Sequence, residues 1–191
     1  LFSLFVANRQ KSRRHWLGTF PENTKVIEDS FEGLLSILDK HLSNRSYLFG
    51  EKPCLGDFGL WGQLYNLYQD PTPKALIKKQ APNVEKWIER MLSPKDEGSY
   101  ESLKTLELTL SPLLEKEVAG VFLPWAHENQ IALKRREKTF KIKVKGNFFE
   151  QGPIKYQSKS FQILKDLFKE MDKSPDLENY LKKTKCWELL S

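Results

Sequence analysis

The sequence predicts an all-α protein, a helical bundle with a long helical extension and one small β-hairpin. Over most of the 191 residues, apolar side chains recur at spacings of three and four, which is typical of helices with one buried face. One stretch, residues 139–156, instead alternates apolar and charged residues, as a strand does. We expect a helical core over residues 1–98 and an extension over residues 99–191 that carries the hairpin and packs on the core.

The first predicted helix covers residues 1–17. Its apolar side carries Phe2 and Phe5, and a basic cluster that includes Arg9 and Arg13 lies opposite or near its end. Cations near a helix C-terminus complement the helix dipole, which gives the cluster a structural explanation. The alternative is that the same cluster captures an anion, and both interpretations stay open at this point.

The second predicted helix covers residues 23–42, with Asn23 or Thr24 as its N-terminal cap. His41 lies near its end, where we expect a surface group, because no second histidine lies at metal-binding spacing. The predicted core face of this helix consists of Ile27, Phe31, Leu34, Leu35, Leu38 and Leu42.

The third predicted helix begins near Pro53 and forms the centre of the bundle. Cys54 and Asp57 have the spacing of a capping box, in which Asp57 carries most of the cap because a thiol is a weak acceptor. Apolar side chains cover almost the whole circumference, which predicts burial on all sides. These side chains are Phe58, Leu60, Trp61, Leu64, Tyr65, Leu67 and Tyr68.

Two more helices complete the predicted core. A turn at Asp70 leads to a short helix over residues 73–79, and a further helix follows Ala81. Residues 95–99 read as a polar, glycine-containing linker. The side chains predicted to face inward from the last core helix are Val84, Trp87, Ile88 and Met91.

The extension begins with a long helical pattern over residues 100–137. Pro112 and Pro124 should kink or divide it, because each removes an amide donor and crowds the preceding turn. Its stripe is the most regular in the sequence and consists of Leu103, Leu106, Leu110, Leu113, Leu114, Val118, Val121, Phe122 and Trp125.

A hairpin and two helices follow. In the hairpin, Phe140, Ile142 and Val144 alternate with lysines, and Gly146-Asn147 is the predicted turn. Residues 186–190 are apolar enough to pack back on the protein. The first of the two helices has the stripe Phe161, Leu164, Leu167, Phe168 and Met171, and the second starts at Ser174-Pro175-Asp176 and carries Leu177, Tyr180 and Leu181.

Two runs in the core carry a family resemblance. YLFGEKPCLGDFGLWGQL, from Tyr47, and APNVEKWIERM, from Ala81, resemble the C-terminal helical domain of the glutathione transferase superfamily. The resemblance covers residues 30–94, and Cys54 stands where the family has Ser or Thr. It implies that a thioredoxin-like domain, absent from this chain, precedes the helical domain and supplies most of the glutathione site.

The resemblance also implies a function. This chain would supply the acceptor-substrate pocket for the transfer of glutathione, as co-substrate, to a small apolar electrophile, and a homodimer is common in the family. The chain contains no residue that we assign as catalytic, so we expect it to be inactive alone. The pocket residues carried over are Phe2, Phe5, Arg9, Arg13, Tyr65 and Tyr68. The alternative is a non-catalytic protein-interaction module of the same fold.

Composition excludes several other classes. The net charge of +6 is spread along the chain without a nucleic-acid motif, so we expect no nucleic-acid partner. No apolar run has the length of a membrane span, and no metal site is expected. Two cysteines without a pairing pattern suggest a reducing compartment, the cytoplasm, and we expect Cys54 to be structural rather than reactive. The start at Leu1 suggests a fragment.

Overall fold

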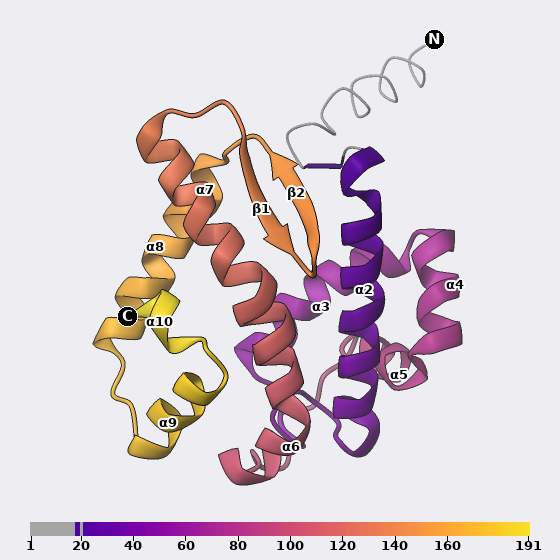
Figure 1. The fold of residues 1–191 in the computed structure, drawn as a ribbon. Coiled ribbons are helices and arrows are strands. Elements are labelled where there is room, and N and C mark those ends of the chain that lie inside the picture. Colours follow the sequence, from indigo (N-terminus) through magenta and orange to yellow (C-terminus); the bar gives the residue numbers. More distant parts are fainter. Residues whose placement is uncertain (1–17, 20) are drawn as a thin grey trace. The chain divides into compact units, whose positions relative to one another are not determined.

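A computed structural model describes residues 18–19 and 21–191 and shows a mostly helical chain with one two-stranded sheet in that part (Figure 1). The predicted first helix, residues 1–17, lies outside the described residues. The helices are α2 (Pro21–His41), α3 (Leu55–Tyr68), α4 (Pro71–Gln80), α5 (Pro82–Arg90), α6 (Leu103–Leu113), α7 (Leu123–Arg135), α8 (Lys155–Glu170), α9 (Pro175–Lys183) and α10 (Trp187–Leu190). The remaining elements are the 3-10 turn η2 (Leu42–Asn44), the π-helical segment η3 (Leu114–Phe122) and the strands β1 (Phe140–Val144) and β2 (Asn147–Gln151). The predicted all-α class with one hairpin is confirmed.

The described residues form two compact units. One contains residues 31–113, and the other contains residues 18–19, 21–30 and 114–191, so helix α2 contributes to both. These units divide the chain at other points than residue 98. The predicted division into core and extension therefore stays a prediction about domains.

The 31–113 unit has one hydrophobic core. Its largest fully buried side chain is Trp87 on α5, and the second half of α2 adds Leu35 and Leu38. The four inward residues predicted for α5 are confirmed, with exposed fractions of 2% or less for Val84, Trp87, Ile88 and Met91. Asp70 caps α4 by accepting a hydrogen bond from the Thr72 N–H at 3.0 Å.

Helix α3 is not buried on all sides, and that prediction was wrong. Leu64 and Tyr68 are buried, whereas Phe58 and Leu67 are 49% and 41% exposed. Together with the partly buried Trp61, the buried positions run from Asp57 to Tyr68 at spacings of four, three and four, so the helix has one buried face. Its other apolar side chains lie beside that face or away from it.

Two expectations for α2 are also corrected. His41 is 1% exposed rather than a surface group, because its ring lies between two hydrogen-bonding partners. Ile27 is 39% exposed and lies off the core face. Asn23 does not cap α2, which begins at Pro21, and instead its side chain bonds to the backbone of Glu150 in β2.

The predicted long helix consists of three segments, of which α6 belongs to the 31–113 unit and η3 and α7 belong to the other unit. The π-helical segment η3 separates α6 from α7, so the predicted long helix is divided next to Pro112 and Pro124 as expected. The described chain turns from α7 into the hairpin at Arg136, which has a left-handed φ of 55°.

The hairpin confirms the predicted alternation and corrects its turn. Phe140, Ile142 and Val144 are buried, and the lysines between them are exposed. Val144 pairs with Asn147, so the two-residue turn is Lys145-Gly146, one residue earlier than predicted. Both turn residues have positive φ, 48° and 83°, which matches the twist of a tight hairpin.

Helix α8 buries only one edge of its apolar side. Phe161 and Phe168 are buried, whereas three of the residues predicted to share their stripe, Leu164, Leu167 and Met171, are 38%, 59% and 44% exposed. The predicted positions lie on one side of the helix, and only the edge formed by Phe161 and Phe168 is buried. Ser174 caps α9 as predicted, and Cys186 and Leu190 pack back into the core.

Candidate functional site

Asp57 fastens three parts of the 31–113 unit to one another. Its side chain is fully buried, and its Oδ1 accepts hydrogen bonds from the Leu48 N–H at 2.9 Å and the Trp87 Nε1–H at 3.0 Å. Its Oδ2 accepts from the Cys54 N–H at 3.0 Å and from the Cys54 thiol at 3.2 Å. The carboxylate half of the predicted capping pair is therefore present, and the same carboxylate also holds the 46–51 loop and α5.

The Cys54 thiol is held in its neutral form. Burial is the largest cause that raises its pKa, and the Asp57 carboxylate, which accepts the thiol hydrogen, raises it further, although backbone N–H groups of the helix start act in the opposite direction. A thiolate is the reactive form of cysteine. The environment of Cys54 thus supports the structural role expected for it.

A second buried network joins α2 to α6 through His41. The His41 Nε2 atom lies 2.7 Å from the Leu48 carbonyl oxygen, which can only accept, so Nε2 carries a hydrogen. Nδ1, at 2.8 Å from the Thr109 hydroxyl, then accepts from it, and Thr109 in turn accepts from Arg45 at 2.9 Å. Arg45 closes the network with an ion pair to Glu101 at 2.8 Å.

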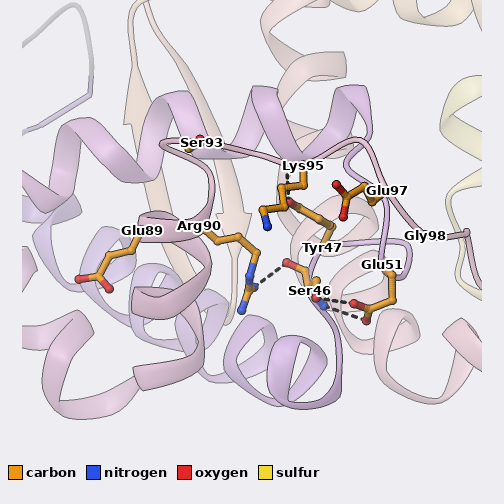
Figure 2. A pocket seen from close by; sticks show the side chains of 9 residues that line it. All are labelled: Ser46, Tyr47, Glu51, Glu89, Arg90, Ser93, Lys95, Glu97 and Gly98. Atoms are coloured by element: carbon orange, nitrogen blue, oxygen red, sulfur yellow. Dashed lines mark hydrogen bonds between the residues drawn. The ribbon is translucent and has the colours of Figure 1, made fainter.

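These two networks fix the walls of a surface pocket of about 580 Å³ (Figure 2). The pocket lies between the 46–51 loop, the end of α5 and the segment that follows α5. Its lining is polar and contains both signs of charge. The lining residues are Ser46, Tyr47, Glu51, Glu89, Arg90, Ser93, Lys95, Glu97 and Gly98.

Ser46 lies at the centre of the pocket. Figure 2 shows Arg90 and Glu51 reaching it from opposite sides: Arg90 donates to its carbonyl oxygen at 2.7 Å, and its hydroxyl donates to Glu51 at 2.5 Å. The buried Tyr47 forms part of the wall and accepts a hydrogen bond from the Lys95 N–H at 3.0 Å. These bonds leave the Lys95 ammonium group without a partner in the described part of the chain.

The pocket suits a polar ligand and not an apolar one. Glu89 and Glu97, like Lys95, have no side-chain partner among residues 18–19 and 21–191, so carboxylates and an ammonium group remain available for binding. A small molecule or peptide end with both charges would match this lining. The Ser46 hydroxyl has a carboxylate beside it and no histidine in the lining, so the pocket lacks the nucleophile and base of acyl transfer.

The comparison with protein families identifies a segment that contains part of this site. Residues 12–90 match the family model of the glutathione S-transferase C-terminal domain. This segment is a glutathione S-transferase C-terminal domain. No match was found among curated proteins or among solved structures. The matched residues contain the Asp57 centre and all of α5, and the pocket residues Ser93, Lys95, Glu97 and Gly98 lie beyond the match.

The acceptor residues expected in this transferase domain are divided between described and undescribed parts. Phe2, Phe5, Arg9 and Arg13 lie outside the described residues. Tyr65 is half-buried on α3, and its ring stacks on Trp61 with centroids 4.9 Å apart. Neither it nor Tyr68 lines the polar pocket.

Tyr68 is tied into the core of the transferase domain. It is buried, and its hydroxyl donates a short hydrogen bond to Glu85. That hydrogen bond, with burial and the Glu85 charge, raises the pKa of Tyr68 to about 12. The phenol therefore stays protonated at neutral pH. The assignment of Tyr65 and Tyr68 as substrate contacts stays a prediction.

Sequence reasoning missed the pocket of the transferase domain. It treated residues 95–99 as a linker, although Gly98 has a φ of 85° and lies against Glu51, so that a Cβ there would be 2.7 Å from the Glu51 Cβ. The signal was a glycine among charged residues directly after a core helix. A glycine there indicates a close backbone approach rather than a flexible connection.

The described residues were compared with the requirements of a metal site and of a membrane-spanning helix. Residues 18–19 and 21–191 contain no group of His, Cys, Asp and Glu that could hold a metal ion. Among the helices of the same residues, none combines the length and the apolar content that crossing a bilayer requires.

Proposed function

We infer that this chain is the helical half of a glutathione-transferase-like protein of the cytoplasm and supplies its acceptor-substrate pocket. The observation that carries this proposal is the family match over residues 12–90, which includes the end of the predicted first helix. In the proposal, Phe2 and Phe5 bind the apolar electrophile, and Arg9 and Arg13 face the anionic glutathione. An apolar pocket with a few polar groups suits such an acceptor.

The proposed reaction joins the sulfur of glutathione to an electrophilic carbon of the acceptor. The thiolate donates its electron pair to form the C–S bond, and the electron pair of the broken bond leaves with the leaving group. A thioredoxin-like domain outside this chain would hold glutathione and stabilise its thiolate. Both cysteines of the chain have raised pKa values, chiefly through burial, so neither supplies a competing thiolate at neutral pH.

The test measures turnover with glutathione and a panel of apolar electrophiles, for the natural full-length protein and for this chain alone. We expect turnover only with the full-length protein, because binding an acceptor without an activated thiolate leaves the barrier high. Phe5→Ala should raise the KM for the electrophile about tenfold, through lost apolar contact, and leave the KM for glutathione unchanged. Phe148→Ala, an exposed aromatic change on β2, is the control. Turnover by the chain alone, or an unchanged electrophile KM in Phe5→Ala, would contradict the proposal.

A non-catalytic interaction module of the same fold is the second candidate. It is favoured by the apolar side chains that α8 exposes, of which Leu167 is 59% and Tyr156 is 76% exposed. Monomers seldom expose large apolar residues in groups, and such groups commonly mark binding surfaces. Absence of turnover by the full-length protein with every electrophile, together with a stable partner complex, would favour this candidate.

A further inference from the structure

Helix α8 exposes a stripe of mostly apolar side chains beside its buried face. Tyr156, Ile163 and Leu167 are 76%, 49% and 59% exposed, and Met171 continues the row at 44%. Ser160 lies between Tyr156 and Ile163 in this row. The five positions from Tyr156 to Met171 are separated by four, three, four and four residues, which keeps them on one side of the helix. Phe161 and Phe168 form the buried face, so the stripe is not needed by the core of its own unit.

Charged residues flank one edge of this stripe in an ordered way. Lys155 and Lys159 lie in the first half of α8, and Asp166 and Glu170 lie in the second half, all on the same side of the stripe. Asp166 accepts a hydrogen bond from Gln162 at 2.8 Å. In the described part of the chain, the side chains of both lysines and of Glu170 have no partner. The edge is therefore basic at one end and acidic at the other.

We propose that the α8 stripe binds the α8 stripe of a second copy of this chain, in an antiparallel pair with two-fold symmetry. Such a pair keeps the charged edges of both helices on the same side and reverses their direction. The basic half of each edge then faces the acidic half of the other. A parallel pair with two-fold symmetry would instead place the two charged edges on opposite sides of the interface, so only the antiparallel arrangement joins the basic half of one edge to the acidic half of the other.

The side chains of the stripe are also complementary in this arrangement. With the symmetry axis between Ile163 and Leu164, the small Ser160 faces Leu167 of the second copy. Tyr156 faces Met171 of the second copy at each end. Lys159 then lies beside Asp166 and Glu170 of the second copy. Large residues meet small or flexible ones, as in packed helix pairs.

The experiment uses charge reversal in the natural full-length protein, with the dissociation constant of the dimer measured by sedimentation equilibrium up to about 100 μM, a range suited to a small interface. Lys159→Glu and Glu170→Lys should each weaken the dimer about tenfold, because each replaces attractive contacts by repulsive ones in both halves of the symmetric pair. Both changes favour the helix dipole, so neither should weaken α8 itself. Lys169→Glu, on the same helix away from the stripe, is the matched control and should leave the dimer unchanged.

Mixing the two variants gives the decisive result. A Lys159→Glu chain and a Glu170→Lys chain have complementary edges, so the mixture should form heterodimers within about threefold of the wild-type affinity. Leu167→Asp should abolish the dimer. A wild-type protein that stays monomeric would overturn the proposal, including one whose stripe binds anionic phospholipid vesicles or another segment instead. A dimer that Leu167→Asp leaves intact would overturn it as well. Either failure leaves the transferase assay unaffected, so the two proposals can be judged separately.

Discussion

Asp57 serves several donors at once. A usual capping carboxylate accepts one or two backbone hydrogen bonds, whereas the buried Asp57 also accepts from the indole of Trp87 and the N–H of Leu48. Removing it leaves these donors buried without acceptors, and a buried polar group without a partner is costly. Its role in stability is therefore larger than its place in a capping pair suggests.

We predict that Asp57→Ala lowers the free energy of unfolding by about 3–5 kcal/mol, because several buried hydrogen bonds are lost together. Urea denaturation of the two proteins measures the difference. Asp70→Ala, which removes the exposed cap of α4, is the control and should cost about 1 kcal/mol. Cys54→Ser should be neutral or stabilising, since a hydroxyl keeps the bond to Asp57. Equal losses for Asp57→Ala and Asp70→Ala would contradict this interpretation.

His41 makes stability depend on pH. Burial lowers its pKa most, the Arg45 charge lowers it further, and the carbonyl of Leu48, with Glu101 and Asp57, acts in the opposite direction. The folded protein therefore binds this proton less readily than the unfolded chain does. Stability from this group is complete above the unfolded pKa, about 6.5, and is lost as the pH falls from there towards the folded pKa.

We predict that the free energy of unfolding falls between pH 7 and pH 5 by up to about 1.4 kcal/mol per pH unit from this residue. His41→Gln, which has an N–H for Leu48 and no proton to bind in this range, should lose that component. The difference between the two proteins, measured by urea denaturation at each pH, isolates His41 from other groups. Parallel pH curves for wild type and His41→Gln would show that the ring does not resist protonation.

At the scale of elements, two glycines in one unit have opposite roles. Gly59 lies inside α3, and an added Cβ would meet nothing within 4 Å. Gly98 has a φ of 85°, and an added Cβ would lie 2.7 Å from the Glu51 Cβ and 3.3 Å from its carbonyl oxygen. The first glycine only raises the entropy cost of the helix, and the second permits a turn beside the polar pocket.

The same substitution should therefore have opposite effects. We predict that Gly59→Ala raises the free energy of unfolding by about 0.5–1 kcal/mol, through higher helix propensity. Gly98→Ala should lower it by about 2–4 kcal/mol, through backbone strain and overlap with Glu51. Thermal or urea denaturation compares the pair directly. A gain in stability in Gly98→Ala would mean that the pocket segment relaxes freely.

The elements that were predicted well depend on local sequence. Pro112 and Pro124 divide a long helix because each lacks an amide, and the inward face of α5 follows from spacing alone. The errors came from distant partners. The ring of His41 bonds to Thr109, which lies 68 positions away in the sequence. The apolar residues of α3 predicted burial on all sides, but other elements cover only one of its faces. In the hairpin, the predicted turn placed a positive φ at Asn147, whereas in the structure Lys145 has the positive φ.

For the whole molecule, the charge of +6 is the property most open to a simple test. Some of this charge is already neutralised, as in the pair of Lys145 with Glu117 at 2.6 Å. In the described part of the chain, Lys141 and Lys143 of β1 are separated by Ile142 and do not form a continuous basic site. A basic protein without such a site binds nucleic acid weakly and through phosphate alone.

We predict no binding of a 20-nucleotide single strand tighter than about 100 μM at 150 mM salt, a nonspecific level. Fluorescence anisotropy with a labelled oligonucleotide measures it, and a neutral polymer of similar size is the reference. Lys141→Glu with Lys143→Glu should leave the signal unchanged. Micromolar affinity that this double change removes would assign the hairpin a nucleic-acid role.

The side-chain amide of Asn23 occupies hydrogen-bonding groups at the edge of strand β2. In the register of the hairpin, Glu150 directs its own N–H and C=O away from β1, where an incoming strand of another molecule would pair. Asn23 fills both positions, accepting the N–H at 3.1 Å and donating to the carbonyl at 2.7 Å. Asn23 therefore occupies the backbone groups through which a strand of another molecule would pair with β2 at Glu150, and such pairing would first have to displace this asparagine.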